Sequence, residues 1–265
     1  MPKKRFASLT ALGGKPLPPE IEVSGHRYVQ RRVFKDDFFA VTALYEGEAG
    51  KVILKIQRQA PFLLIPMTWV GRWLVGRELS SFERLRGVEG IPEVIAPWGK
   101  TGMVRRYVEG HPLARGERVA DDFHARLRSL IDTMHDRGMA YVDLEKSENV
   151  LVGEDGRPHL FDFQISWHLP RKRGGELWPM RVVRRWLQRG DLYHLRKLQR
   201  RTRPDQLSPE ELALSYRRPW YVRVHRFVTY PFTFCRRLVL DRIDPRRDSA
   251  MLSRHRRAGA YQAEG

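Results

Sequence analysis

The clearest periodic signal in the chain is an apolar stripe within residues 120–137. Its members fall at helical intervals, at Phe123, Leu127, Leu130, Ile131 and Met134. This spacing places them on one face of an amphipathic helix, and Gly138 is typical of the residue that ends one. Apolar residues recur at similar intervals over residues 69–85, which predicts a second helix.

Strands are predicted mainly in the first part of the chain, from stretches rich in β-branched and aromatic residues. Residues 26–57 contain HRYVQRRVF and KVILKIQ, with a hairpin turn at residues 47–50. Residues 102–110 predict a short strand that runs into a glycine turn. Residues 150–152 and 159–163 predict a hairpin of two short strands.

After Ser166 the pattern becomes helical in several pieces. Ser208, Pro209 and Glu211 together predict a capping box and a helix start. Strands followed by helices indicate an α+β fold, and the break between the two parts is expected within residues 108–112.

Length and composition indicate a globular protein. The 265 residues are 42% hydrophobic and 30% charged, which suits one sizeable core or two lobes. The single cysteine, Cys235, excludes an internal disulfide, and the start of the chain lacks the apolar stretch of a cleaved signal. The longest apolar run, residues 61–70, is too short to span a bilayer. We therefore expect a cytoplasmic protein, or one at the inner face of a membrane.

The net charge of +18 is concentrated in the last hundred residues. From Ile165 onward there are 24 Lys and Arg against 9 Asp and Glu. Such a surface favours an anionic partner, such as phospholipid, nucleic acid or an acidic substrate, although a solvated basic face without a partner has the same composition.

Two segments in this basic region mix aromatic residues with arginine. They are residues 178–203 and residues 218–240. Aromatic and basic side chains together suit an anionic membrane surface. Nucleic acid is a weaker candidate, because no RNA-binding motif accompanies them. The same aromatic residues also suit simple packing against the rest of the fold.

The candidate chemistry begins at residues 138–152, directly after the predicted helix. Asp143 can accept a proton from a hydroxyl acceptor, and Asn149 offers a neutral oxygen to a metal ion. Asp162 follows at the end of the next predicted strand, where its carboxylate can bridge a metal to phosphates. The order of these three side chains, Asp143, Asn149 and Asp162, predicts phosphoryl transfer.

Lys55 is the candidate phosphate ligand upstream. It lies on a predicted strand, where its ammonium group can contact phosphates if an acidic partner holds it in place. Glu78, in the helix that follows, is the expected partner. Glu83 is a weaker candidate, because it faces a different side of the same helix.

These stretches resemble the motifs of protein-kinase-like enzymes. GMAYVD is similar to the approach to the kinase catalytic loop, with Tyr141 and Val142 where those enzymes have His and Arg before the Asp. FDFQ is similar to the metal-binding Asp-Phe-Gly, with Gln164 in place of the glycine. The resemblance implies that the enzyme uses ATP and Mg²⁺, with Asn149 and Asp162 as metal ligands.

RRYVEGHPL resembles the kinase hinge, which implies that the backbone of Arg106 and Val108 meets adenine. The likeness covers residues 26–166. In detail it is closest to small atypical kinases, namely the RIO-type, lipopolysaccharide-core and aminoglycoside-phosphotransferase enzymes. It implies a bilobal fold: an extension (1–25), a small β-rich N-lobe (26–108), and a mainly helical C-lobe (109–265) that includes the basic, aromatic C-terminal region.

Three departures from the kinase pattern stand out. DLEKSEN is one residue longer than the usual DLKPEN, so Lys146 falls one place late for the lysine that neutralises the γ-phosphate. FKDDFFAVTALYEG has no glycine-rich loop, and Asp36 and Asp37 would repel phosphates if they faced inward. No activation segment that ends in Ala-Pro-Glu is present.

The resulting hypothesis is an ATP-dependent kinase with Asp143 and Lys146 as catalytic residues. The acceptor is a hydroxyl on a protein serine or threonine, or on a sugar or lipid, and the sequence does not separate these. The rival hypothesis is a pseudokinase, a catalytically inactive scaffold that binds a membrane or nucleic acid through its basic region.

Overall fold

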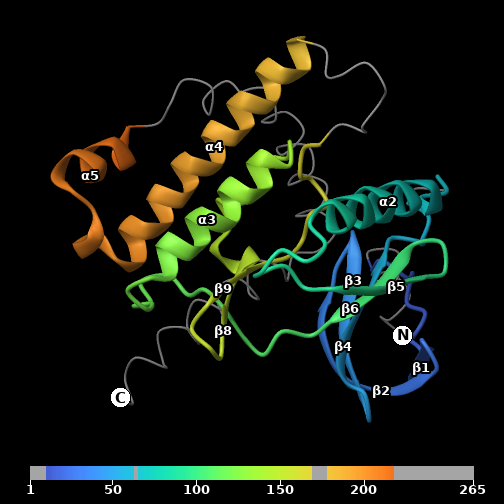
Figure 1. Cartoon of the computed structure of the whole chain (residues 1–265). Helices are drawn as coiled ribbons and strands as arrows, with labels where there is room; N and C mark the ends of the chain where they lie inside the picture. Colours follow the sequence, from blue (N-terminus) through green and yellow to red (C-terminus); the bar gives the residue numbers. More distant parts are fainter. Residues whose placement is uncertain (1–9, 63–64, 169–177, 218–265) are drawn as a thin grey trace, which may run out of the picture. The chain divides into compact units, whose positions relative to one another are not determined.

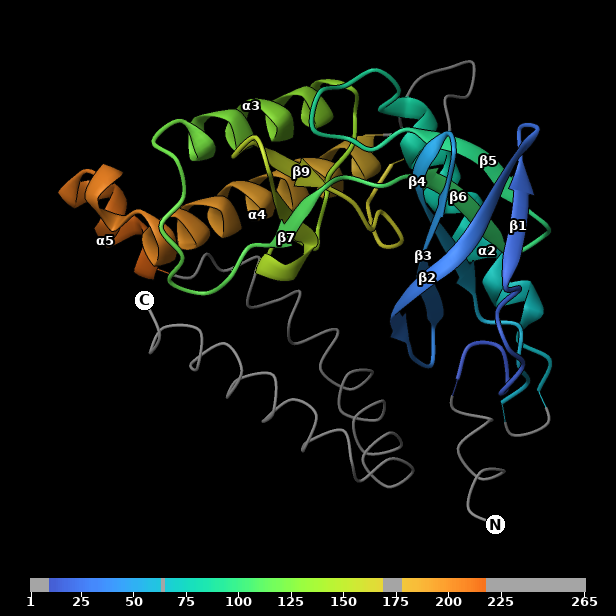
Figure 2. The same cartoon turned by 90° about the horizontal axis from the view of Figure 1, so that it is seen from below.

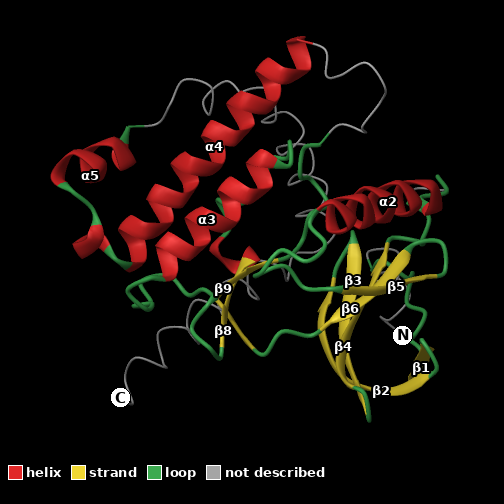
Figure 3. Ribbon diagram, in the orientation of Figure 1, coloured by secondary structure: helices red, strands yellow, loops and turns green. Residues whose placement is uncertain are grey.

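The computed structural model describes residues 10–62, 65–168 and 178–217. The chain divides into two compact units, residues 1–206 and residues 207–265. Strands and helices are segregated in the first unit, with a sheet in its first half and helices mainly in its second (Figures 1 and 3). The predicted α+β class is confirmed.

The sheet of the first unit is antiparallel and has the strand order β1-β2-β3-β4-β6-β5. Its strands are β1 (Glu20–Val23), β2 (His26–Asp36), β3 (Ala40–Gly47), β4 (Gly50–Gln57), β5 (Val94–Trp98) and β6 (Gly102–Arg106). The predicted turn at residues 47–50 joins β3 to β4. The sequence patterns did not predict β1 or β5 as strands, and β1 lies within residues 1–25, which we expected to be an extension.

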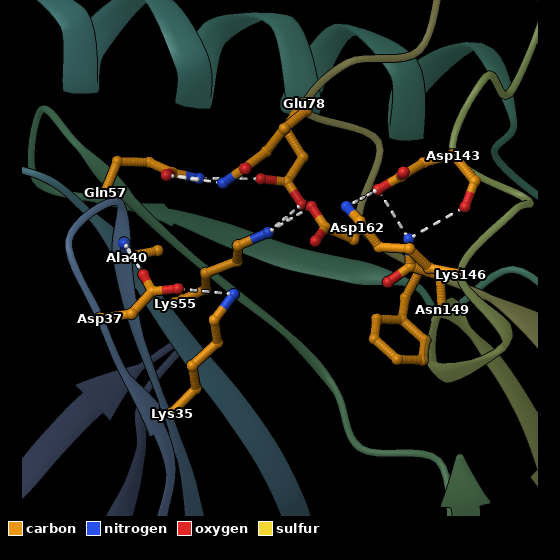
Figure 4. A network of polar contacts seen from close by, with 12 residues as sticks. Lys35, Asp37, Ala40, Lys55, Gln57, Glu78, Asp143, Lys146, Asn149 and Asp162 are labelled. Carbon is orange, nitrogen blue, oxygen red and sulfur yellow. Dashed lines mark hydrogen bonds and ion pairs between the residues drawn. The ribbon is translucent and has the colours of Figure 1, made fainter. Parts of the chain in front are cut away.

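The central strand β4 is buried on both faces. Every residue from Val52 to Gln57 is buried, so the strand reads as a continuous apolar run interrupted by Lys55, instead of alternating. On one face, Val52, Leu54 and Ile56 join the core of the sheet. On the other face, Lys55 points toward the helical part of the unit (Figure 4). Burial of both faces therefore fixes the direction of Lys55.

Helix α2 (Thr68–Arg84) lies across one end of the sheet, as Figure 1 shows. It approaches the end of β4 closely at Gly71, where a Cβ atom would lie only 2.3 Å from the carbonyl oxygen of Arg58. A larger residue would push the helix away from the strand. This close approach places the middle of α2, including Glu78, above Lys55.

The helical part of the unit is built around α3 (Phe123–Asp136) and α4 (Trp178–Thr202), which lie side by side in Figures 1 and 2. The predicted apolar stripe of α3 is buried in a core shared with α2 and α4. Gly138 follows α3 with φ of 75°, a conformation that costs glycine little. The helix prediction for this segment is confirmed.

A small sheet completes this part of the unit, with strand order β7-β8-β9. Its strands are β7 (Gly110–Pro112), β8 (Val150–Gly153) and β9 (Pro158–Leu160). The short 3₁₀ helices η1 (Ser147–Asn149) and η2 (Pro204–Gln206) precede β8 and follow α4. The predicted hairpin is confirmed as β8 and β9. It presents residues 143–149 and Asp162 at its two ends.

The basic helix α4 carries buried leucines and exposed tryptophans. Leu195 and Leu198 are buried in the core, whereas Trp178 and Trp186 are 75% and 38% exposed. The leucines thus serve packing, and the tryptophans lie at the surface of the described chain. The second aromatic and basic segment, residues 218–240, and Cys235 lie outside the described residues. No helix in the described ranges has the length and apolar character needed to cross a membrane.

In the second unit, the described residues form α5 (Pro209–Tyr216). The Ser208 side chain accepts a hydrogen bond from the Glu211 backbone, and the Glu211 side chain accepts one from the Ser208 backbone. The predicted capping box is confirmed.

His124 in α3 is expected to make folding sensitive to acid. Its Nε2 lies 2.7 Å from Thr202 Oγ1, and burial, aided by the charge of Arg203, lowers the pKa of His124 to about 4. A lowered histidine pKa gives stability that is complete above the unfolded value of about 6.5 and is lost as the pH falls toward 4. Between pH 7 and 5, we expect the wild type to lose about 1–2 kcal/mol more unfolding free energy than a His124→Gln variant.

Urea unfolding at the two pH values measures this difference. His26→Gln, at an exposed histidine at the start of β2, is the matched control and should keep the wild-type slope. Equal pH slopes for the wild type and His124→Gln would contradict the prediction.

Candidate active site

The centre of the candidate site is a buried ion pair between the sheet and α2. Lys55 Nζ lies 2.7 Å from Glu78 Oε1 and 3.0 Å from Asp162 Oδ1, as Figure 4 shows. Lys55 is 8% exposed and Glu78 is fully buried. Glu83, the weaker candidate, is exposed and pairs with Arg86 instead. Of the two predicted partners, Glu78 is therefore the one that contacts Lys55.

The three charges determine one another's protonation. Burial opposes the charge of Lys55, but the attraction of Asp162 and Glu78 outweighs it and raises the Lys55 pKa. Burial also opposes the charge of Asp162, yet Lys55, then Lys35 and Lys146, lower the pKa of that carboxyl. Burial raises the pKa of Glu78, an effect that Lys55 counteracts. Near neutral pH, Lys55 is thus an ammonium and Asp162 a carboxylate.

A second set of hydrogen bonds holds the other oxygen of Glu78. Gln57 Nε2 donates to Glu78 Oε2 at 2.9 Å, and Gln164 Nε2 donates to Gln57 Oε1 at 2.7 Å. Gln57 is fully buried. Gln164, which stands where the kinase motif has glycine, therefore ties the segment after Asp162 to β4 and α2. No local pattern in the sequence marks Gln57 for this role.

Asp143, Lys146 and Asn149 form a compact group after α3. Asp143 Oδ2 accepts hydrogen bonds from Lys146 Nζ at 2.6 Å and from Asn149 Nδ2 at 2.8 Å. The Asp143 side chain is 13% exposed. The one-residue insertion thus still allows Lys146 to reach the predicted base, although its ammonium contacts Asp143 in this conformation.

Asp191 of α4 fixes the backbone just before Asp143. Its carboxylate accepts hydrogen bonds from the backbone N–H of Tyr141 and of Val142, both at 2.8 Å, and its Oδ2 lies 3.0 Å from His135 Nε2. Val142 has φ of 72°, which is strained for a β-branched residue and persists only where the surroundings enforce it. Asp191, 1% exposed, supplies that enforcement. No local pattern in the sequence marks Asp191 for this role.

An aromatic stack holds Asp162 in place. The ring of Phe163 packs edge to face against Phe82 of α2, with centroids 4.9 Å apart, and against Tyr141, with centroids 5.5 Å apart. The Tyr141 hydroxyl donates to the Phe161 carbonyl at 2.5 Å. Asp162 itself has φ of 68°. The stack therefore supports a strained residue whose carboxylate faces Lys55.

The predicted hinge residues lie at the end of β6 and just after it. Arg106 N–H donates to the Glu93 carbonyl at 2.8 Å, and the Arg106 carbonyl accepts a hydrogen bond from Arg105 Nη1 at 3.3 Å. The Arg105 guanidinium also lies 5.3 Å from the Phe161 ring centroid, and burial lowers the Arg105 pKa to about 10. The Arg106 carbonyl thus already accepts one hydrogen bond, and Val108 lies two residues after the end of β6.

The residues present fit a magnesium ion. Asp162 is ionised, and Asn149 uses its Nδ2 toward Asp143, so that among the described residues no donor occupies its Oδ1. Magnesium is usually bound by one or two carboxylates together with substrate phosphates and water. The described residues contain no group of three or more His, Cys, Asp or Glu placed to hold a metal ion.

A cavity of the described chain lies elsewhere. It has a volume of about 460 Å³ and is lined by the loop after α2, the outer side of α3 and the β8–β9 turn. None of the candidate site residues lines it. Its arginines, Arg126, Arg137 and Arg157, already bond to carboxylates or backbone carbonyls.

Six of the eight predicted site residues form two groups in contact between the sheet and the helices. Lys55, Glu78 and Asp162 are in direct contact, and so are Asp143, Lys146 and Asn149. Arg106 follows on the β6 strand next to β4. Val108 is half-buried and lies two residues after the end of β6. Their roles stay predictions.

No protein-family profile and no curated protein matches the sequence. Among solved structures, Rio2 kinase from Chaetomium thermophilum, in its ADP/Mg²⁺-phosphoaspartate complex, is similar with a TM-score of 0.51 and 16% identity. The match covers 70% of this chain and 61% of that one, so this chain spans less than two thirds of the Rio2 structure.

Another Rio2 structure from the same organism matches with a TM-score of 0.47, 17% identity and coverage of 67% of this chain and 59% of that one. The BubR1 kinase domain matches with a TM-score of 0.46, 15% identity and coverage of 73% and 68%. At these identities, the similarity concerns the fold. Together with the sheet, α2 and the paired helices described above, the Rio2 match shows that this chain has an α+β, protein-kinase-like fold.

Proposed function

We propose that this chain is an ATP- and magnesium-dependent phosphotransferase that transfers the γ-phosphate to a hydroxyl group. The observation that carries the proposal is the geometry around Asp162. An ionised carboxylate lies 3.0 Å from the ammonium of Lys55, on the side of the site where Asn149 and Asp143 meet. Phosphoryl transfer depends chiefly on such placed charges.

Each site residue has a role in this proposal. Lys55, held by Glu78, contacts the α- and β-phosphates, and Asp162 and Asn149 bind the magnesium ion. That ion neutralises charge that develops on the phosphates. Asp143 orients the acceptor hydroxyl and takes its proton, and Lys146 moves from Asp143 to the γ-phosphate. The backbone of Arg106 and Val108 meets adenine.

The Rio2 complex supports the choice of nucleotide and metal, since that protein was crystallised with ADP and Mg²⁺. In this proposal the acceptor hydroxyl belongs either to a serine or threonine of a protein, or to a sugar or lipid. The basic region that includes α4 would favour an acceptor with negative charge nearby, such as a glycolipid at an anionic membrane surface.

A thermal-shift series tests the proposal. We expect MgATP to raise the melting temperature by several degrees, as selective binding to the folded state requires, and ATP with EDTA to raise it less. In Asp162→Asn, we expect MgATP affinity to fall about tenfold, or ~1.4 kcal/mol, toward the value without metal. Glu83→Gln, on the exposed side of α2, is the control.

Transfer of label from γ-labelled ATP to the protein, to a test peptide or to water supplies the second readout. A folded wild type that neither shifts with any nucleotide nor releases label would contradict the proposal. If that protein also bound anionic vesicles or RNA in a salt-sensitive manner, the scaffold hypothesis would replace it.

A further inference from the structure

The turn between β2 and β3 uses its backbone amides internally. Asp37 Oδ1 accepts hydrogen bonds from the N–H of Phe39 at 2.9 Å and of Ala40 at 3.0 Å, and Asp37 N–H donates to the Ala40 carbonyl at 3.1 Å. In a glycine-rich loop, such N–H groups are available to phosphate oxygens. Here a carboxylate already occupies them.

Aromatic packing holds this turn in its shape. The guanidinium of Arg58 lies 3.8 Å from the ring centroid of Phe38 and donates to the Phe38 carbonyl at 2.9 Å. The Phe38 ring also packs against Phe39 and Phe62, each with centroids 5.1 Å apart. The turn is thus anchored to the end of β4, and freeing its amides would require these contacts to change.

The same turn also holds the side chain of Lys35, near the end of β2, through an ion pair. Asp37 Oδ2 lies 3.0 Å from Lys35 Nζ. Lys35 pairs in register with Thr42, and Thr42 pairs with Lys55, so both lysines leave the sheet on the same face. Figure 4 shows their ammonium groups on the same side as Asp162.

Three ammonium groups therefore gather near one carboxylate. Lys55 Nζ lies 3.0 Å from Asp162 Oδ1, and Figure 4 shows the ammonium groups of Lys35 and Lys146 on the same side of the site. The three lysines come from β2, β4 and the segment after Asp143. Their convergence creates a positive site beside the predicted metal ligand, without any glycine-rich loop.

We propose that Lys35 binds the phosphates of the nucleotide in place of the missing loop amides, and that Asp37 holds Lys35 ready until a phosphate replaces it. This inference rests on the proposed function. The Lys35 side chain is 54% exposed and the Asp37 side chain is 39% exposed. Exposed pairs of this kind are weak, so a triphosphate can displace the carboxylate. A lysine ammonium is a common point-charge ligand of phosphate.

Calorimetric titration of the full chain with MgATP and with adenosine tests this role. We expect Lys35→Met to weaken MgATP binding about tenfold or more while adenosine binding stays unchanged, because adenosine has no phosphate. Lys35→Arg keeps the charge and should stay within about threefold of the wild type. Arg27→Met removes a comparably exposed ion pair, with Glu20, at the other end of β2 and is the matched control.

The Asp37→Asn variant tests whether the Asp37 carboxylate holds Lys35 until a phosphate replaces it. Asparagine keeps the oxygen that accepts the two turn amides and removes the charge that competes for Lys35, so MgATP binding should tighten a few-fold. Equal affinity of Lys35→Met and wild type for MgATP would overturn the inference, as would an equal loss for MgATP and adenosine. An Asp37→Asn protein that binds MgATP no more tightly than the wild type would refute this role of Asp37. These outcomes differ from a wild type that binds no nucleotide, which would refute the proposed function and this inference with it.

Discussion

Replacing Asp143 by asparagine is expected to slow phosphate transfer about a thousandfold and to leave MgATP affinity within about threefold. Removing a positioned general base costs roughly 10²–10⁴ in rate. Asparagine preserves the size of the side chain and one oxygen for the bonds from Lys146 and Asn149. Binding should therefore persist, since the nucleotide is held mainly by other residues.

Single-turnover release of label from γ-labelled ATP measures the rate, and calorimetry measures the affinity. Asp155→Asn, at an exposed carboxylate in the β8–β9 turn, is the control and should keep the wild-type rate. Unchanged transfer in Asp143→Asn would remove Asp143 as the base. A parallel loss of rate and affinity would indicate a structural role in the loop.

Replacing Asp191 by alanine is expected to lower the unfolding free energy by about 3–5 kcal/mol. The carboxylate is buried and accepts hydrogen bonds from two backbone N–H groups, in addition to its contact with His135. Alanine would leave those donors buried without acceptors, and each such donor costs about 1–3 kcal/mol. The strained φ of Val142 would also lose its support, so residues 141–143 should lose their fixed conformation.

Urea unfolding at pH 7 measures the loss. Asp191→Asn keeps one acceptor oxygen and should cost less, about 1–2 kcal/mol. Asp132→Ala removes an exposed carboxylate that pairs with Arg128 on α3 and should change the unfolding free energy by less than about 0.5 kcal/mol. A loss below about 1 kcal/mol for Asp191→Ala would contradict this account.

The sequence by itself determined the elements with strong periodicity and the order of the candidate chemistry. The stripe of α3 and the apolar run of β4 encode their own burial, because the side chains that must leave water repeat at the period of the element. Lys55, Asp143, Asn149 and Asp162 were identifiable because they follow one another in the order, and on the kinds of element, that a phosphoryl-transfer site needs.

Only the tertiary structure decided which side chains complete the site. Gln57 meets Gln164 across 107 positions, and Tyr141 meets Asp191 across 50. No local pattern marks such pairs, because each residue alone is an ordinary polar side chain and its partner is chosen by the packing of whole elements. β1 and β5 were missed for a different reason, because both are edge strands of only four and five residues and so carry a weak local signal.

The turn at Asp37 shows most clearly what the sequence alone could not predict. In the sequence, Asp36 and Asp37 in place of glycines argued only against phosphate binding. In the structure, Asp37 accepts hydrogen bonds from two backbone N–H groups of the turn and contacts Lys35, and β2 brings that lysine to the face that carries Lys55. The sequence determined that the glycine loop is missing. The register of three strands decided which charge stands in its place, because only pairing between strands brings residues 35 and 55 to the same face.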